Sequence, residues 1–197
     1  RGLVDEFNKS VDEGTVDYDG YHNFLKTYGR YLDIQKPSIL DNIYYLFEYQ
    51  IGYMYWRYFM WNFSGRQDDI QGKMDLHGNW ITGINFIDSF LLGITQENLP
   101  TDVLNNKARN SYYLLPFLLG LIGFLFVLKK DKKVFWTMLV FFLFTGVAIQ
   151  VYTNVRPFEP RERDYSLVGS FYVFALWIGI GVYAIYDWLS TYSKSKL

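Results

Sequence analysis

The sequence contains no cysteine, and only two of its 197 residues, His22 and His77, are histidines. The missing thiols exclude disulfide scaffolds and thiolate metal sites, and they leave the redox compartment open. So few imidazoles also exclude a histidine-rich metal site. The net charge is only −1, so no overall field would attract nucleic acid, and we do not expect nucleic acid as a partner.

Aromatic residues, in contrast, are abundant. They make up 21% of the chain, and hydrophobic residues make up 50%, so the aromatic share lies far above ordinary globular usage. Charged residues gather in blocks between long apolar runs. This pattern predicts an all-α, polytopic helical membrane protein with interfacial helices and an aromatic, charged loop region on its outer face. The chain begins with arginine and stops soon after an apolar run, so we expect a segment of a longer protein.

Three apolar runs approach the length of roughly 20 residues that a helix needs to cross the hydrocarbon of a bilayer. They lie at about residues 112–128, 134–152 and 167–188. A soluble fold would require three consecutive helices that are apolar on every face, which suits a membrane far better than a small core. The sequence therefore divides into an outer-face loop region with interfacial helices, residues 1–110, and a transmembrane region, residues 111–197.

The lysines indicate the orientation. Four of them separate the first two apolar runs, and two follow the third: Lys129, Lys130, Lys132 and Lys133, then Lys194 and Lys196. Positive charge concentrates on the cytoplasmic side of a membrane. We therefore expect residues 1–110 and 153–166 to face the outer side.

Residues 39–63 are rich in tyrosine and tryptophan, which favour the boundary between membrane and water. One or two interfacial helices are expected there. Two alternatives stay open: an ordinary buried helix, or a spanning helix whose Glu48 and Arg57 face the protein interior. The short apolar stretch 80–92 is expected to be a re-entrant or interfacial piece.

Arginines flanked by aromatic residues suit a lipid phosphate, because the planar guanidinium donates paired hydrogen bonds and keeps its charge. Four positions fit this description: Arg57, Arg66, Arg161 and Arg163. The alternative is structural pairing. In that case Arg161 and Arg163 would neutralise Glu162 and Asp164, or the acids near Asp68.

Polar and aromatic residues near these arginines are expected to line a substrate site. They are Trp56, Tyr58, Trp61, Asn62, Asp68, Asp69, His77, Asp164 and Tyr165. Asp68, Asp69, Asp75 and His77 offer oxygen ligands and one imidazole, but their spacing matches no compact ligand motif. We interpret them as a solvated acidic loop and expect no tightly bound metal.

Two long motifs and two short ones resemble those of a large bacterial family of multi-pass membrane proteins. The long motifs are residues 53–63 (YMYWRYFMWNF) with 65–67 (GRQ), and residues 160–165 (PRERDY) with 169–172 (GSFY). The short motifs are residues 77–80 (HGNW) and 110–113 (NSYY). The family was long catalogued as a domain of unknown function and is now placed with protein O-mannosyltransferases of the GT-C type. The similarity extends from about Tyr21 to Leu189, nearly the whole chain.

The resemblance implies part of a membrane-embedded glycosyltransferase in a bacterial inner membrane. It would move a sugar, mannose by analogy, from a polyprenyl-phosphate donor to a protein hydroxyl on the periplasmic side. The implied partners are membrane lipid, the lipid-linked sugar donor and an acceptor protein, with no tightly bound cofactor. The catalytic acid of GT-C enzymes usually lies in the first outer loop, so it is expected outside this segment. The alternative is a non-catalytic membrane scaffold or transporter subunit that binds lipid or a partner protein.

Overall fold

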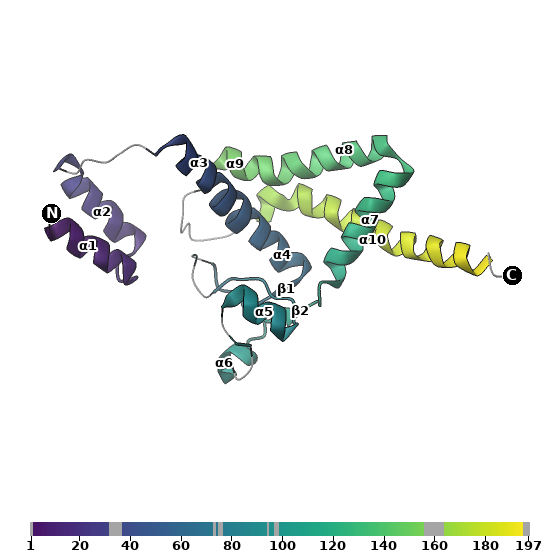
Figure 1. Cartoon of the computed structure of the whole chain (residues 1–197), viewed down its shortest axis with the longest axis horizontal. Coiled ribbons are helices and arrows are strands. Elements are labelled where there is room, and N and C mark those ends of the chain that lie inside the picture. The colour runs from purple at the N-terminus through teal and green to yellow at the C-terminus, as the bar shows by residue number, and fades with distance from the viewer. Residues whose placement is uncertain are drawn as a thin grey trace. The chain divides into compact units, whose positions relative to one another are not determined.

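The computed structural model describes residues 2–31, 37–72, 74, 77–93, 95–96, 99–155 and 164–194. Most of these residues are helical, which confirms the predicted helical class, and one pair of short strands joins them (Figure 1). The chain forms two compact units, residues 1–42 and 43–197. The boundary expected near residue 110 separates regions by their side of a membrane, and that division stays a prediction.

The first unit contains a pair of helices, α1 (Gly2–Asp12) and α2 (Tyr18–Tyr28), followed by the short turn η1 (Gly29–Tyr31). The helices contact each other through stacked rings of Phe7 and Phe24, whose centroids lie 3.8 Å apart. The carboxylate of Asp17 accepts the backbone N–H of Gly20 at 2.8 Å. This bond satisfies one of the donors that a helix start leaves open.

Residues 39–63 form a helical segment that comprises α3 (Ile39–Tyr45), η2 (Leu46–Arg57) and α4 (Tyr58–Phe63). Ser38 and Asp41 begin it with reciprocal bonds, in which Ser38 N–H donates to Asp41 and Asp41 N–H donates to Ser38 Oγ. The bonds from Ser38 lower the pKa of Asp41. The central part, η2, is a π-helix, with hydrogen bonds from residue i to i+5. The expected helix is confirmed, and its depth in a membrane stays a prediction.

The main core of the second unit is aromatic. Phe59 lies at its centre, 2% exposed, with its ring against Phe142, Phe171 and Phe174. These partners belong to α8 (Lys132–Leu143) and α10 (Asp164–Lys194), and Phe59 also contacts Phe117 of α7 (Leu115–Lys130). Two further helical segments, η3 (Phe144–Ala148) and α9 (Ile149–Thr153), continue α8. Helix α4 is thus held against the apolar helices by ring contacts.

Helices α7 and α10 approach closely where glycines meet backbone. A Cβ atom at Gly123 would lie 1.9 Å from the carbonyl oxygen of Trp177. A Cβ atom at Gly181 would lie 2.0 Å from the carbonyl oxygen of Leu119. Small residues at such crossings are typical of helices that pack in membranes, because they let backbones touch.

Two helical runs are long and apolar enough to cross a membrane, Lys132–Thr153 with 22 residues and Tyr165–Ser193 with 29. The third expected span, at 112–128, is a helix of only 16 residues, α7. At 1.5 Å per residue it measures about 24 Å, less than the hydrocarbon thickness of roughly 30 Å. It begins late because Tyr113 and Leu114 take positive φ angles of 53° and 60°.

Between α4 and α7 the chain folds back on the start of α7. Strand β1 (Gly65–Arg66) pairs antiparallel with β2 (Asn110–Ser111), and two helices lie between them, α5 (Asn85–Leu92) and α6 (Thr101–Leu104). The N–H of Tyr112 donates to Ser64, and the N–H of Tyr113 donates to Thr82. The stretch expected to be re-entrant or interfacial therefore forms a loop and the eight-residue helix α5.

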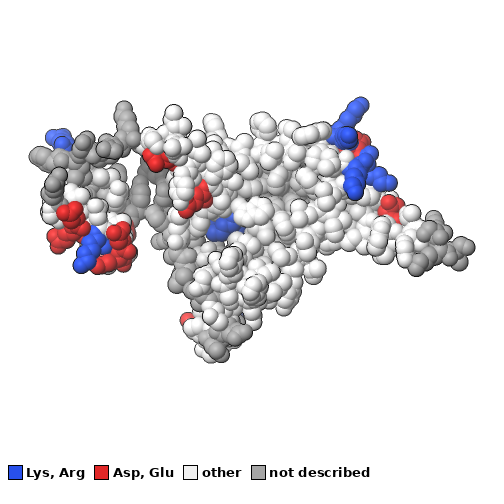
Figure 2. All heavy atoms as spheres, in the orientation of Figure 1, with Lys and Arg blue, Asp and Glu red and all other residues white. Residues whose placement is uncertain are grey.

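Figure 2 shows a broad uncharged face over the apolar helices, with basic side chains gathered at the turn between α7 and α8. Those side chains belong to Lys129, Lys130, Lys132 and Lys133, all exposed. Lys130 also lies 3.9 Å from the Asp187 carboxylate of α10. Four of the six lysines that predicted the cytoplasmic side thus form one cluster at one end of the helices. Lys196 lies outside the described residues, and the side chain of Lys194 is not described.

Candidate functional site

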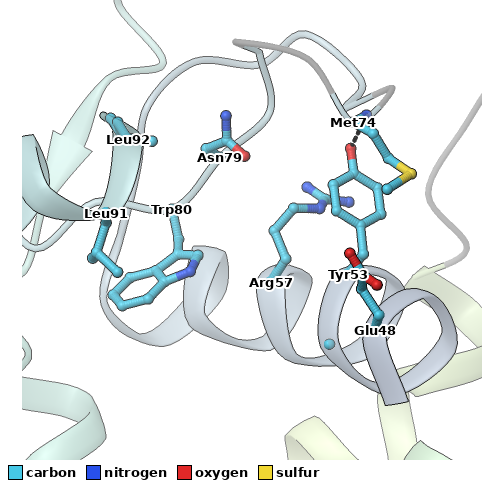
Figure 3. A pocket seen from close by; sticks show the side chains of 9 residues that line it. Glu48, Tyr53, Arg57, Met74, Asn79, Trp80, Leu91 and Leu92 are labelled. Atoms are coloured by element: carbon cyan, nitrogen blue, oxygen red, sulfur yellow. Dashed lines mark hydrogen bonds between the residues drawn. The ribbon is translucent and has the colours of Figure 1, made fainter. Parts of the chain in front are cut away.

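A cavity of about 270 Å³ lies beside η2 in the second unit (Figure 3). Its lining combines polar, aromatic and aliphatic side chains. The lining residues are Glu48, Gly52, Tyr53, Arg57, Met74, Asn79, Trp80, Leu91 and Leu92. One of the four predicted phosphate-binding arginines, Arg57, is among them.

The π-helix explains why three of these residues share a face. In an α-helix with 3.6 residues per turn, the nine steps from Glu48 to Arg57 would span two and a half turns and place these two residues on opposite sides. In η2 the backbone bonds reach from residue i to i+5, so residues four or five apart lie above one another. Glu48, Tyr53 and Arg57 follow each other at steps of five and four, and all three line the cavity.

Arg57 is 6% exposed, although its side chain carries a charge. Its Nη1 donates a hydrogen bond to the carbonyl oxygen of Gly78. Its Cζ atom lies 4.5 Å from the ring centroid of Tyr53, a distance at which a cation is attracted to an aromatic face. These contacts fix the guanidinium in one place beside the cavity.

A tight loop covers Arg57 and Tyr53. A Cβ atom at Gly72 would lie 2.5 Å from the Tyr53 hydroxyl and 3.2 Å from Arg57 Cζ. Gly78 has φ +67°, and a Cβ atom there would lie 2.4 Å from the backbone nitrogen of Gly72. The Tyr53 hydroxyl accepts the N–H of Met74 at 2.6 Å. Only glycine allows the backbone to approach this closely, so the loop depends on Gly72 and Gly78.

The carboxylate of Asp68 binds the backbone of this loop. It is 7% exposed, and its Oδ1 accepts the backbone N–H of Gly78 at 2.9 Å and that of Ile70 at 3.1 Å. Its Oδ2 lies 2.9 Å from Nδ1 of His77, whose side chain is 51% exposed. The carboxylate is therefore bound on both oxygens, and Gly78 connects it to Arg57.

Arg66 belongs to the same neighbourhood. Its Cζ atom lies 4.0 Å from the ring centroid of Trp61, and Nε1 of Trp61 donates to the carbonyl oxygen of Asp68 at 3.2 Å. The Arg66 Nε atom is buried with no hydrogen-bond partner in the described part of the chain. Stacking on the indole therefore holds that part of the guanidinium. The backbone of Arg66 pairs with Trp80, which lines the cavity.

Backbone hydrogen bonds position Asn79 and Trp80 at the cavity, and a buried carboxylate positions Leu91 and Leu92. Gln67 N–H donates to Asn79 at 3.0 Å, and Ile81 N–H donates to Gly65 at 3.1 Å. The carboxylate of Asp88, 2% exposed, accepts three bonds at 2.6–2.8 Å, from Thr82 N–H, Thr82 Oγ1 and Gly83 N–H. Asp88 thereby fixes α5, which contributes Leu91 and Leu92 to the cavity.

Several predicted lining residues lie elsewhere. Trp56 contacts Phe59 and Phe117, and Tyr58 is a buried core residue against Trp61 and Phe171. Asn62 donates back to the carbonyl oxygen of Tyr58 on its own helix. Asp69 is exposed, and Tyr165 is 72% exposed at the start of α10. Among the predicted residues of the described chain, Arg57, Trp61, Arg66, Asp68 and His77 are the ones brought together.

The second charged motif cannot be placed. Arg161 and Arg163 lie outside the described residues, as does Asp75 of the acidic loop, and the side chain of Asp164 is not described. Within the described ranges, no group of three or more His, Asp or Glu side chains could hold a metal ion. The phosphate role of Arg161 and Arg163 stays a prediction.

Sequence reasoning missed most of the cavity lining: Glu48, Tyr53, Asn79, Trp80, Leu91 and Leu92. Three of them belong to the motifs quoted above: Tyr53 to the long motif 53–63, and Asn79 and Trp80 to the short motif 77–80. Glu48 carries a further interaction, since a hydrogen bond with its carboxylate raises the pKa of the Tyr44 phenol.

Comparison of the chain with known protein families, with characterised proteins and with solved structures finds no match. The chemistry of the cavity must therefore be argued from its own residues. It combines a fixed cation, a carboxylate and an amide with an indole and two leucines, which suits an amphiphile with an anionic group.

Proposed function

We propose that this chain is part of a membrane-embedded glycosyltransferase that moves a sugar from a polyprenyl-phosphate donor to a protein hydroxyl. The proposed location is a bacterial inner membrane, with the cavity on the outer side, and the proposed sugar is mannose. The observation that carries the proposal is Arg57, a buried and fixed guanidinium at an amphipathic cavity beside apolar helices.

The donor has three chemically different parts, and the cavity offers a counterpart for each. Arg57 provides the positive charge and the hydrogen-bond donors that a phosphate requires. Trp80, Leu91 and Leu92 provide an apolar surface for the first part of the polyprenyl chain. The polar remainder of the lining is left for the sugar.

A fixed guanidinium would also favour the reaction itself. When the acceptor hydroxyl attacks the anomeric carbon, its oxygen forms the new bond and its proton passes to a general base, which we expect outside this segment. The bond from the anomeric carbon to the phosphate oxygen breaks, and the electron pair stays on the lipid phosphate. Charge therefore develops on the oxygen nearest Arg57. A donor already held in position stabilises that charge without having to reorganise. Arg66 stacks on Trp61 in the same neighbourhood and is a second cation for the leaving phosphate.

The membrane part of the proposal combines α7 with the two longer runs as three spans. Close packing of α7 on α10 at Gly123 and Gly181 supports this arrangement. A helix shorter than the hydrocarbon is accommodated by local thinning of the bilayer or by flanking residues that reach the interface. Lys129 and Lys130 at the end of α7 are suited to that role.

The proposal is tested by a transfer assay with the intact protein in lipid vesicles, a polyprenyl-phosphate mannose donor and a hydroxyl-bearing acceptor peptide. The expected result is transfer that requires the lipid-linked donor, with no transfer from the matching nucleotide sugar. Binding of polyprenyl phosphate without any transfer would contradict the enzyme and favour a lipid-binding scaffold or transporter subunit.

A further inference from the structure

Arg57 lies between two groups of lining residues, and only one of the groups carries a charge (Figure 3). Trp80, Leu91 and Leu92 lie with Asn79 on one side of Arg57, and Glu48 and Tyr53 lie with Met74 on the other. In a polyprenyl-phosphate sugar the phosphate likewise separates the apolar chain from the sugar. With the phosphate on Arg57 and the chain along the leucines, the sugar falls at the Glu48 end. This placement rests on the function proposed above.

Glu48 and Arg57 are the only charged residues among the described residues that line the cavity. The Glu48 side chain is exposed, so a ligand can reach its carboxylate. The π-helical register of η2 is what brings this carboxylate to the same face as Arg57. An α-helix through the same residues would turn Glu48 away from the cavity.

A carboxylate at the sugar end has two effects on recognition. Its oxygens accept hydrogen bonds from sugar hydroxyls, and bonds to a charged acceptor are stronger than those between neutral groups. It also repels a second carboxylate at short range, an effect that solvent weakens because the Glu48 side chain is exposed. We propose that Glu48 is a specificity-determining residue that admits donors with a neutral sugar and rejects donors whose sugar carries a carboxylate.

The test compares two donors in the intact protein: polyprenyl-phosphate mannose and the same lipid carrying the matching uronic acid. The measured quantity is the ratio of kcat/KM for the two donors. The wild-type protein should prefer the neutral donor by roughly fivefold. Glu48→Gln should bring the ratio towards one, chiefly by improving the uronic acid donor, and Glu48→Lys should favour that donor.

Asp102→Asn is the matched control, because Asp102 is an exposed acid at the start of α6 and does not line the cavity. It should leave the ratio at the wild-type value. Thermal unfolding of each variant shows whether the fold is retained. A ratio that stays the same in folded Glu48→Gln and Glu48→Lys would overturn the assignment.

Failure of the proposed function is recognised separately. If the wild-type protein transfers neither sugar, the enzyme proposal is lost, and the relative affinity for the two lipids is measured in its place by competition with labelled polyprenyl phosphate. A relative affinity that Glu48→Lys inverts would support charge selection by Glu48. A relative affinity that no Glu48 variant changes would contradict it.

Discussion

The carboxylate of Asp68 accepts a hydrogen bond of 2.9 Å from the backbone N–H of Gly78. The carbonyl of the same glycine accepts a bond from Arg57, so one peptide residue connects a buried acid to the cation at the cavity. Asp68 thus acts on the proposed phosphate site through the loop and makes no contact with the cavity itself. This distinguishes a positioning role from direct binding.

Removing the Asp68 carboxylate should loosen that loop. Asp68→Ala leaves the N–H groups of Gly78 and Ile70 without their acceptor. The buried Gly78 donor left unpaired costs about 1–3 kcal/mol, whereas Ile70 is exposed and its N–H can turn to water. Asp68→Asn keeps an oxygen for both, so we expect a smaller loss. Hydrogen exchange at Gly78 should quicken strongly in Asp68→Ala and only slightly in Asp68→Asn. Equal protection in all three proteins would contradict the connection.

Gly123 should not tolerate a side chain. Its added Cβ atom would lie 1.9 Å from a backbone oxygen of α10, which cannot move aside as a flexible side chain can. Gly123→Ala is expected to lower the free energy of unfolding by at least about 1–3 kcal/mol. Gly179→Ala is the control, because nothing lies within 4 Å of its Cβ position on α10. Thermal unfolding in a bilayer mimetic measures both; similar midpoints would argue against the close crossing.

Asp88 should matter for stability although it lies outside the cavity. Its three donors lose their acceptor in Asp88→Ala, and we expect a cost of about 3 kcal/mol or more. The exposed Asp69→Ala serves as the comparison and should change stability by about 0.5 kcal/mol or less. The free energy of unfolding of both variants is measured by denaturant unfolding. An Asp88→Ala variant as stable as Asp69→Ala would show that the three bonds to Asp88 do not stabilise the fold.

The helices could be predicted from the sequence where composition alone determines that a segment is a long apolar helix. The runs that became Lys132–Thr153 and Tyr165–Ser193 contain hardly any charge, so their length and apolarity are visible without structure. The start of α7 was not visible in this way. It depends on the left-handed backbone of Tyr113 and Leu114, and neither residue type favours that conformation.

The candidate site was predictable only in part, for a similar reason. Charged and aromatic polar side chains are candidate site residues in a membrane sequence, and five of them do lie near one another: Arg57, Trp61, Arg66, Asp68 and His77. The relation of Glu48 to Arg57 depends on a π-helix, whereas periodicity arguments assume 3.6 residues per turn. Leu91 and Leu92 reach the cavity through the buried bonds of Asp88, which local patterns do not show.

The orientation can be tested with single cysteines, because the chain contains none of its own. Asp69→Cys and Lys132→Cys both replace exposed residues. The cluster of lysines between α7 and α8 predicts that Lys132 is cytoplasmic. A membrane-impermeant maleimide added to intact cells should therefore label Asp69→Cys and spare Lys132→Cys until the membrane is opened. The opposite labelling pattern would reverse the proposed topology and place the cavity on the cytoplasmic side.

Arg57 provides the most direct test of the phosphate site. Lysine keeps the positive charge but loses the planar fork that donates paired bonds, so Arg57→Lys should slow transfer from the lipid-linked donor by on the order of a hundredfold. Arg30→Lys, an exchange at an exposed arginine of the first unit, should not change the rate. The decisive measurement is the transfer rate of Arg57→Lys at a donor concentration that saturates the wild-type protein, with thermal unfolding measured on the same sample. A folded variant with a strongly reduced rate is the predicted result, and a folded variant with the full rate would contradict the role of Arg57 as the phosphate-binding cation.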